Sequence, residues 1–144
     1  MAAVIDADGL ILGRLCTHVA KRLLSGEDIV VVNAEKAVVS GRRAQLLEFY
    51  KHRRKRGKSH LTKGPYYPRT ADRIIKRSVR GMVEYRKPSG RAALKRLRVY
   101  LGVPQEYAKA KAETVEGAKK PHLTKYILLK EITEELGSIQ EMKR

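Results

Sequence analysis

Two aspartates near the amino terminus could hold a catalytic metal ion. Asp6 and Asp8 lie at the carboxyl end of the apolar segment Val4-Ile5. Paired carboxylates at the end of a strand bind Mg²⁺ in nucleases and other phosphoryl-transfer enzymes. Such sites usually need further carboxylates, and Glu35 is the only nearby candidate in the sequence. The alternative is a turn in which the aspartates accept hydrogen bonds from nearby backbone amides. Two aspartates with so few other carboxylates nearby favour this turn over a metal site.

Other patterns that could carry chemistry are weaker. Asp8 to Arg14 joins an expected strand to an expected helix, the context of a phosphate-binding turn, but its glycine spacing fits neither the dinucleotide-binding motif nor the P-loop. The four histidines lack the spacing of zinc hydrolases. Cys16 falls on an apolar helix stripe, where a packed thiol is expected. We therefore expect no catalytic residue, no metal site and no cofactor.

The strongest chemical signal is a concentration of positive charge. The chain carries 32 Lys and Arg against 15 Asp and Glu, a formal net charge of +17. Residues 42–98, the basic centre, contain 20 basic and three acidic side chains and so hold the whole excess. Self-repulsion on this scale costs folding free energy unless a partner neutralises it. Nucleic acid is the natural partner, because each Lys or Arg that meets a phosphate releases condensed counterions.

Arginines and tyrosines alternate within the basic centre. Arg outnumbers Lys there, which favours forked contacts with phosphate. Arg73, Arg77 and Arg80 repeat at i, i+4 and i+7 and so form one helical stripe. Tyr66 is a candidate for stacking on an unpaired base, with packing in the core as an equal alternative. The candidate RNA-binding residues are Arg53, Arg54, Lys55, Arg56, Lys58, Lys63, Tyr66, Arg69, Arg73, Arg77, Arg80, Lys87 and Arg91.

Composition excludes several other classes of protein. A chain of 144 residues with 42% hydrophobic residues can build its own core and is not a disordered basic tail. One cysteine excludes a disulfide framework and a Cys-based zinc knuckle. No apolar run approaches the roughly 18 residues of a membrane span, and the amino terminus carries acid where a signal peptide carries base. We expect a polyanionic partner, no membrane partner and no small-molecule substrate.

The elements that must carry the basic centre begin with a βαβ unit. Val4-Ile5-Asp6 is typical of a short strand. Leu12 to Leu24 has apolar residues at i, i+3, i+4, i+7 and i+8, which predicts a helix. Ile29 to Val32 is a continuous β-branched run, typical of a strand that is covered on both faces in a parallel sheet. This order of elements predicts a right-handed crossover.

Shorter elements follow through the basic centre. Ala37-Val38-Val39 predicts another strand, and a helix that opens at Ser40-Gly41 runs on to residue 56. Residues 57–68 form a basic loop by their Gly and Pro content. Thr70 can N-cap the helix that carries the arginine stripe, with Met82 on its inner face.

The last third of the chain is less regular. Pro88-Ser89-Gly90 precedes a short basic helix, and Arg98 to Leu101 predicts a strand. Residues 105–122 are polar and are expected to be extended or mobile. A final amphipathic helix is predicted from Thr124 to Leu136, with a frayed tail at 138–144. The chain shows no internal repeat, and we expect residues 1–144 to form a single domain.

Several motifs are shared with a known family. The opening from Val4 to Leu15 resembles that family's first strand and helix start, and Ile29 to Lys36 resembles its second strand and turn. The most specific stretch runs from Val79-Arg80-Gly81-Met82-Val83 through Gly90-Arg91 to Leu97-Arg98-Val99-Tyr100.

One further motif and one departure refine this likeness. Gly64-Pro65-Tyr66-Tyr67 is similar to the archaeal and eukaryotic branch. Glu84 departs from the family, which usually has Pro at this place. On these motifs the chain resembles the universal large-subunit ribosomal protein L-thirteen family, archaeal type.

The resemblance implies a fold and a function. The fold is α/β, a Rossmann-like four-stranded parallel sheet with flanking helices, plus basic helices and loops and a C-terminal helix. The function is that of a structural constituent of the cytoplasmic ribosome, which binds large-subunit ribosomal RNA and neighbouring ribosomal proteins, supports subunit assembly and catalyses nothing. The C-terminal helix is a candidate protein contact, with packing inside the chain as the alternative.

Two other functions remain open at this point. A Mg²⁺-dependent RNA nuclease or RNA-modifying enzyme would use Asp6 and Asp8. A DNA-binding or chromatin module would use the basic centre on duplex DNA.

Overall fold

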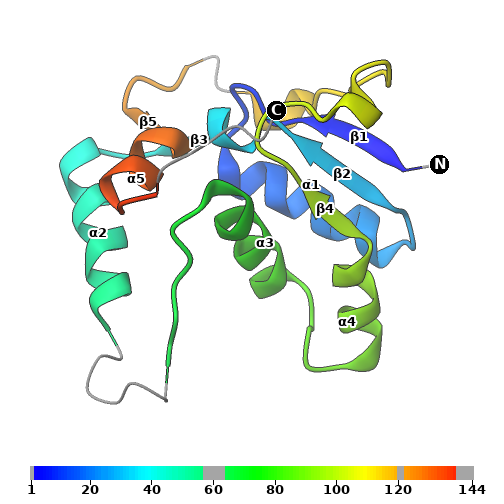
Figure 1. Cartoon of the computed structure of the whole chain (residues 1–144), viewed down its shortest axis with the longest axis horizontal. Helices are drawn as coiled ribbons and strands as arrows, with labels where there is room; N and C mark the ends of the chain where they lie inside the picture. Colours follow the sequence, from blue (N-terminus) through cyan, green and yellow to red (C-terminus); the bar gives the residue numbers. More distant parts are fainter. Residues whose placement is uncertain (1, 57–63, 120–121, 139–144) are drawn as a thin grey trace.

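The parallel sheet has three strands. The computed structural model describes residues 2–56, 64–119 and 122–138 (Figure 1). Strands β1 (Ala3–Asp6), β2 (Ile29–Val32) and β4 (Leu97–Val99) pair in parallel in the order β1-β2-β4. Helix α1 (Leu12–Leu24) connects the first two, with the bounds that its apolar periodicity predicts. The predicted βαβ unit is therefore confirmed.

The prediction of a four-stranded parallel sheet is wrong. Strand β3 (Val38–Ser40) pairs antiparallel with β5 (Tyr126–Leu128) in a separate two-stranded sheet. Only residues 33–37, including the 3-10 turn Ala34–Lys36, separate β3 from β2. A parallel crossover needs about a dozen residues, so β3 cannot return alongside β2 in the same direction.

The segment 105–119 is irregular but anchored. It contains two short 3-10 turns, Gln105–Tyr107 and Glu116–Ala118. Between them, the Glu113 backbone exchanges two hydrogen bonds with β1, from the Asp6 amide (3.0 Å) and to the Val4 carbonyl (2.8 Å). This pairing occupies the outer edge of β1, which would otherwise expose unpaired backbone groups.

The C-terminal element is a strand followed by a short helix. The predicted helix from Thr124 to Leu136 is wrong in its first half, which forms β5, and right in its second, which forms α5 (Leu129–Glu135). Leu129 and Ile132 of α5 are fully buried. These two apolar side chains of α5 therefore pack within the chain, as the alternative to a protein contact requires.

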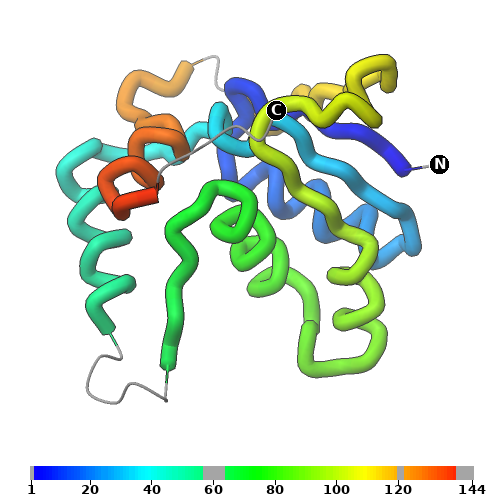
Figure 2. Tube along the Cα trace, in the orientation of Figure 1, coloured from blue at the N-terminus to red at the C-terminus, as the bar shows by residue number. Residues whose placement is uncertain are grey.

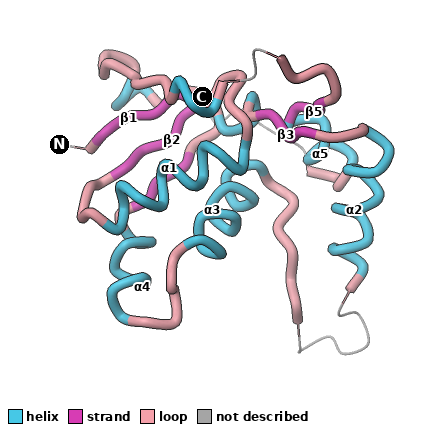
Figure 3. The backbone as a smooth tube through the Cα atoms, turned by 180° about the vertical axis from the view of Figure 1, so that it is seen from behind, coloured by secondary structure: helices cyan, strands magenta, loops and turns pink. Residues whose placement is uncertain are grey.

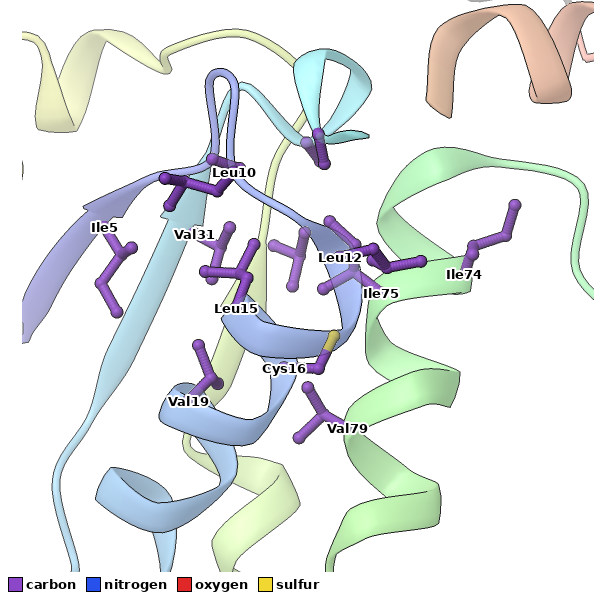
Figure 4. Close-up of a cluster of buried hydrophobic side chains, with 14 of the residues drawn as sticks. Ile5, Leu10, Leu12, Leu15, Cys16, Val19, Val31, Ile74, Ile75 and Val79 are labelled. Carbon is purple, nitrogen blue, oxygen red and sulfur yellow. The ribbon is translucent and has the colours of Figure 1, made fainter. Parts of the chain in front are cut away.

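One core joins the sheet to two helices. Leu15, Cys16 and Val19 of α1 lie between Val31 of β2 and the helix α3 (Ala71–Met82), as Figure 4 shows. Helices α1 and α3 cover one face of the sheet (Figure 3). A smaller apolar cluster covers the other face and consists of Val4, Val30 and Val32, with Tyr100 and Tyr107 packed against them.

The basic helices and the segment that joins two of them lie on one side of the molecule. Helix α2 (Arg43–Lys55), the segment 64–70, α3 and α4 (Pro88–Lys95) all lie on the side of the molecule drawn lowest in Figure 2. Met82 is 44% exposed, so its predicted inward position is wrong. It is the last residue of α3, at the rim of the α1–α3 contact, where its sulfur lies 3.6 Å from the Thr17 hydroxyl.

Helix α2 is attached to α5 by ion pairs as well as by packing. None of its residues is fully buried. Arg43 pairs with Glu131, and the Lys51 ammonium lies 2.7 Å from the Glu135 carboxylate. The hydrogen bond and charge of Lys51 hold the pKa of Glu135 below its usual range. Because the folded-state pKa is lowered, the pair supports folding above the ordinary glutamate pKa and loses this effect as the pH falls.

We therefore expect Glu135→Gln to loosen α2 locally. Hydrogen exchange of the α2 amides at neutral pH should accelerate by no more than a few-fold, because exposed ion pairs contribute little. The amides of α1 should be unchanged. Glu106→Gln, at an exposed glutamate for which the described residues provide no ion pair, is the matched control. Equal exchange in both variants would contradict a role for this pair.

Candidate nucleic-acid interface

A groove opens between the segment 64–70, α3 and α4. Its volume is about 560 Å³. The cationic residues around it come from three separate parts of the chain, α2, the segment 64–70 and α3, and apolar residues lie among them. The lining residues are Arg54, Tyr66, Tyr67, Pro68, Arg69, Arg73, Lys76, Arg77, Arg80, Leu94 and Leu97.

The amphipathic pattern of α3 orients the arginine stripe. Ile75 and Val79 are fully buried against α1 (Figure 4). Residues on the opposite side of the same helix must then point away from the core. Arg73 and Arg80 are accordingly exposed, and Arg77 is half-buried where the segment 64–70 passes over it. The predicted stripe is a real surface feature.

Tyr67 organises the arginines between α2 and α3. Its ring centroid lies 4.2 Å from the Arg77 guanidinium and 5.1 Å from that of Arg53, distances typical of cation–π contacts. The Arg77 guanidinium also donates a hydrogen bond of 2.9 Å to the Tyr66 carbonyl. Arg54 donates one of 3.3 Å to the Tyr67 carbonyl. These contacts hold three guanidinium groups in place before any ligand binds.

A second, smaller cavity adjoins the groove. It has a volume of about 310 Å³ and lies between α2 and α3, where Arg53, Tyr67 and Arg77 line it together with Tyr50. Farther along α3, the Arg80 guanidinium lies 4.1 Å from the centroid of the Tyr85 ring. Hydrogen bonds from Arg80 and Arg86 lower the pKa of the Tyr85 hydroxyl. Two members of the stripe, Arg77 and Arg80, are thus each paired with an aromatic ring.

The cations of the groove have no acidic partners among the described residues. Among residues 2–56, 64–119 and 122–138, no carboxylate lies within 4.0 Å of Arg54, Arg69 or any member of the α3 stripe. By contrast, Arg22 outside the basic centre pairs with both Glu27 and Glu113 at 2.7 Å. The positive charge of the groove is therefore left for a ligand to neutralise.

The structure brings together about half of the predicted RNA-binding residues. Arg54, Tyr66, Arg69 and the three arginines of the stripe line the groove, and Arg53 lines the adjoining cavity. Four other predicted residues are exposed but line neither the groove nor the adjoining cavity. These are Lys55 and Arg56 at the end of α2, Lys87, whose ammonium lies 2.5 Å from the Glu84 carboxylate, and Arg91. Lys58 and Lys63 fall outside the described residues.

Five groove residues were not among the predicted ones: Tyr67, Lys76 and the apolar Pro68, Leu94 and Leu97. Lys76 lines the groove, and its place three residues after Arg73 on a helix could have revealed it. Tyr67 organises the arginines, but nothing in the sequence distinguishes it from a core tyrosine. Thr70 stands at the N-cap of α3, as predicted, yet its hydroxyl makes no capping hydrogen bond.

The aspartates near the amino terminus form a turn. One Asp6 carboxylate oxygen accepts hydrogen bonds from the Asp8 amide (3.0 Å) and from the Asn33 side chain (2.9 Å). The Glu35 carboxylate accepts one from the Gly102 amide at 3.0 Å. Within the described part of the chain, no three His, Cys, Asp or Glu side chains gather as metal ligands. The geometry therefore gives the nuclease alternative no support.

Cys16 and the glycine turn near the amino terminus, which are the remaining candidates for chemistry, have structural explanations. Burial raises the pKa of the Cys16 thiol to about 12, so it stays protonated at neutral pH. Gly9 adopts a φ of +67°, which suits a tight turn. Of the helices in the described residues, none has the length and apolar character to span a membrane.

The proteins to which this chain is similar agree with a surface that binds nucleic acid. Residues 1–106 match the family model described as ribosomal protein L13. Three archaeal relatives carry the name large ribosomal subunit protein uL13. The one from Methanosarcina barkeri is 51% identical over 94% of this chain and 97% of its own length. The relative from Methanococcoides burtonii is 48% identical with the same coverage, and that from Archaeoglobus fulgidus is 50% identical over 93% of this chain and 86% of its own length. The chain therefore belongs to the ribosomal protein L13 family, a family of structural ribosomal proteins rather than enzymes.

Proposed function

We propose that the protein is a structural constituent of the large ribosomal subunit and that its basic centre binds ribosomal RNA during and after assembly. The observation that carries this proposal is the groove, where arginines from α2, α3 and the segment 64–70 meet with no carboxylate partner in the part of the chain that the structure describes. Preorganised guanidinium groups suit phosphate, because each can present two parallel N–H donors. The names of the archaeal relatives support the same assignment.

We assign the cations two kinds of contact. Those of the groove and the adjoining cavity would bind phosphates of one RNA segment that crosses α3. The residues at the ends of α2 and α4 would reach neighbouring RNA segments, because they are exposed and lie away from the groove. This second group is Lys55, Arg56, Lys87 and Arg91, with Lys58 and Lys63 assigned from the sequence alone.

The setting of this function is also part of the proposal. Residues 1–144 would act as one domain, since all the helices described pack on the same core cluster. The partners would be large-subunit ribosomal RNA and neighbouring ribosomal proteins in the cytoplasm. The contacts with those proteins would involve surfaces other than Leu129 and Ile132 of α5, which are buried within the chain.

Binding should depend strongly on salt. If the protein neutralises six to ten phosphates of deproteinised large-subunit ribosomal RNA, its affinity should fall by about 10³- to 10⁵-fold between 50 and 200 mM salt. Filter binding of the full chain at several salt concentrations measures this slope. A flat response would contradict electrostatic anchoring.

Two further measurements separate the proposal from its rivals. The cellular protein should sediment with large ribosomal subunits at moderate salt, and structured ribosomal RNA should compete better than duplex DNA for the purified chain. Preference for duplex DNA would instead support a chromatin-type module. RNA cleavage that needs Mg²⁺ and disappears in Asp6→Asn would support the enzyme.

A further inference from the structure

We propose that the groove receives the base of one unpaired nucleotide of ribosomal RNA, whose flanking phosphates lie on the cationic rim. This inference rests on the proposed function and adds to it the part of the RNA that the groove recognises. It concerns base insertion, whereas the salt-dependent contacts described above concern phosphate alone.

The first observation is the apolar floor of the groove. Leu94 of α4 and Leu97 of β4 line it together with Pro68. A phosphate gains nothing from such a surface, because charged groups lose hydration when they are pressed against apolar side chains. A nucleobase has a flat apolar face and gains from leaving water there. The floor and the rim therefore suit different parts of one nucleotide.

The second observation is that two neighbouring tyrosines have different environments. Tyr67 is half-buried and its ring contacts the guanidinium groups of Arg53 and Arg77. Tyr66 is 66% exposed while it also lines the groove. Its ring lies close against Gly64, where an added Cβ would stand 2.6 Å from a ring carbon. The glycine thus permits a ring position at the groove that an alanine would disturb.

The third observation is the size and rim of the groove. A volume of about 560 Å³ falls in the range of sites that hold small organic ligands. Arg69, Arg73 and Lys76 are exposed at its rim, within reach of the phosphates on either side of an inserted base. Guanidinium planes can also stack on the base itself.

These features select an unpaired nucleotide. Base edges in the major groove of A-form RNA are out of reach of side chains, whereas bases in loops and bulges can be splayed out and stacked on aromatic rings. An acidic peptide would satisfy the rim, but only its aromatic residues would suit the floor beside Tyr66, whereas every nucleotide carries a flat base next to its phosphate. The occupant is therefore a base with its sugar-phosphate backbone.

The test compares Tyr66→Ala with Tyr66→Phe in the full chain on deproteinised large-subunit ribosomal RNA. Loss of a base–aromatic stack should weaken binding by about 10- to 100-fold in Tyr66→Ala. The slope of log affinity against log salt should stay the same, because no cation is removed. Tyr66→Phe keeps the ring and should bind like the unmodified protein.

Chemical probing locates the base independently of affinity. Dimethyl sulfate and carbodiimide together modify the pairing edges of all four bases. The unmodified protein and Tyr66→Phe should protect at least one unpaired base that Tyr66→Ala leaves reactive. Equal affinity and equal protection in Tyr66→Ala and the unmodified protein would overturn base insertion while leaving phosphate binding intact. Failure of the unmodified protein to bind the RNA would instead refute the proposed function.

Discussion

Replacement of Arg73, Arg77 and Arg80 with glutamate is expected to abolish binding to ribosomal RNA. The change reverses three charges on one side of α3 and places carboxylates where phosphates would lie. The three arginines lack carboxylate partners among the described residues, so their loss removes no internal ion pair there. Filter binding at 50 mM salt should show affinity lowered by at least about 10³-fold, since counterion release is lost at each contact and repulsion is added.

A matched variant tests whether position matters more than net charge. Lys109, Lys111 and Lys125 are exposed and lie outside the groove. Their triple replacement with glutamate changes the formal charge by the same amount and should cost far less affinity. Similar losses in the two triple variants would mean that the protein binds through its overall charge and not through the groove.

The fold of the arginine variant must also be checked. The core side of α3, with Ile75 and Val79, is untouched, so the far-ultraviolet circular dichroism spectrum should be preserved. Arg77 does bond the Tyr66 carbonyl, and Arg80 lies over the Tyr85 ring, so small local shifts are expected. Loss of the helical spectrum would mean that the stripe is structural and would refute its assignment to RNA.

Local periodicity explains which parts of the fold could be predicted. The apolar stripe from Leu12 to Leu23 repeats over three turns, and only a helix buries it on one side. The run Ile29–Val32 is buried at all four positions, as a strand between two covered faces must be. The charge stripe of α3 follows from the same spacing, because its apolar residues decide which way the arginines point.

Non-local pairing explains what could not be predicted. Leu128, Ile132 and Leu136 repeat at i, i+4 and i+8, a spacing that fits a helix, yet Tyr126–Leu128 forms a strand because β3 offers an edge far away in the sequence. The groove has the same origin, since Leu94 and Leu97 meet the stripe only through tertiary packing. The role of Tyr67 depends on where Arg53 and Arg77 arrive, which no single segment encodes.

The turn between α3 and α4 shows how a departure from the family pattern is accommodated. Val83 has φ −107° and ψ 149°, the extended conformation that a residue before proline requires. Glu84 therefore follows a backbone that is already shaped for the proline found there in the family. The Glu84 carbonyl then accepts a hydrogen bond of 2.9 Å from the Lys87 amide, which closes the turn.

Gly90 is expected to be essential to this turn. It lies in the first part of α4 and is buried. A Cβ at this position would stand 2.2 Å from the Glu84 carbonyl oxygen and 2.9 Å from the Tyr85 amide nitrogen, and both are backbone atoms. Gly90→Ala must therefore displace the turn or the helix, and we expect the free energy of unfolding to fall by about 3 kcal/mol or more.

Gly81→Ala is the matched control for this substitution. Gly81 lies within α3, and an added Cβ there has no atom within 4 Å beyond its own helix. Alanine should raise the free energy of unfolding by about 0.5–1 kcal/mol, because glycine is a poor helix former. Urea denaturation of both variants measures the two effects, which should have opposite signs. A stable Gly90→Ala would show that α4 packs less closely on the turn than the structure indicates.

Displacement of the turn would also move Tyr85 away from Arg80. The Gly90→Ala variant should therefore lose affinity for ribosomal RNA even under conditions where it remains folded.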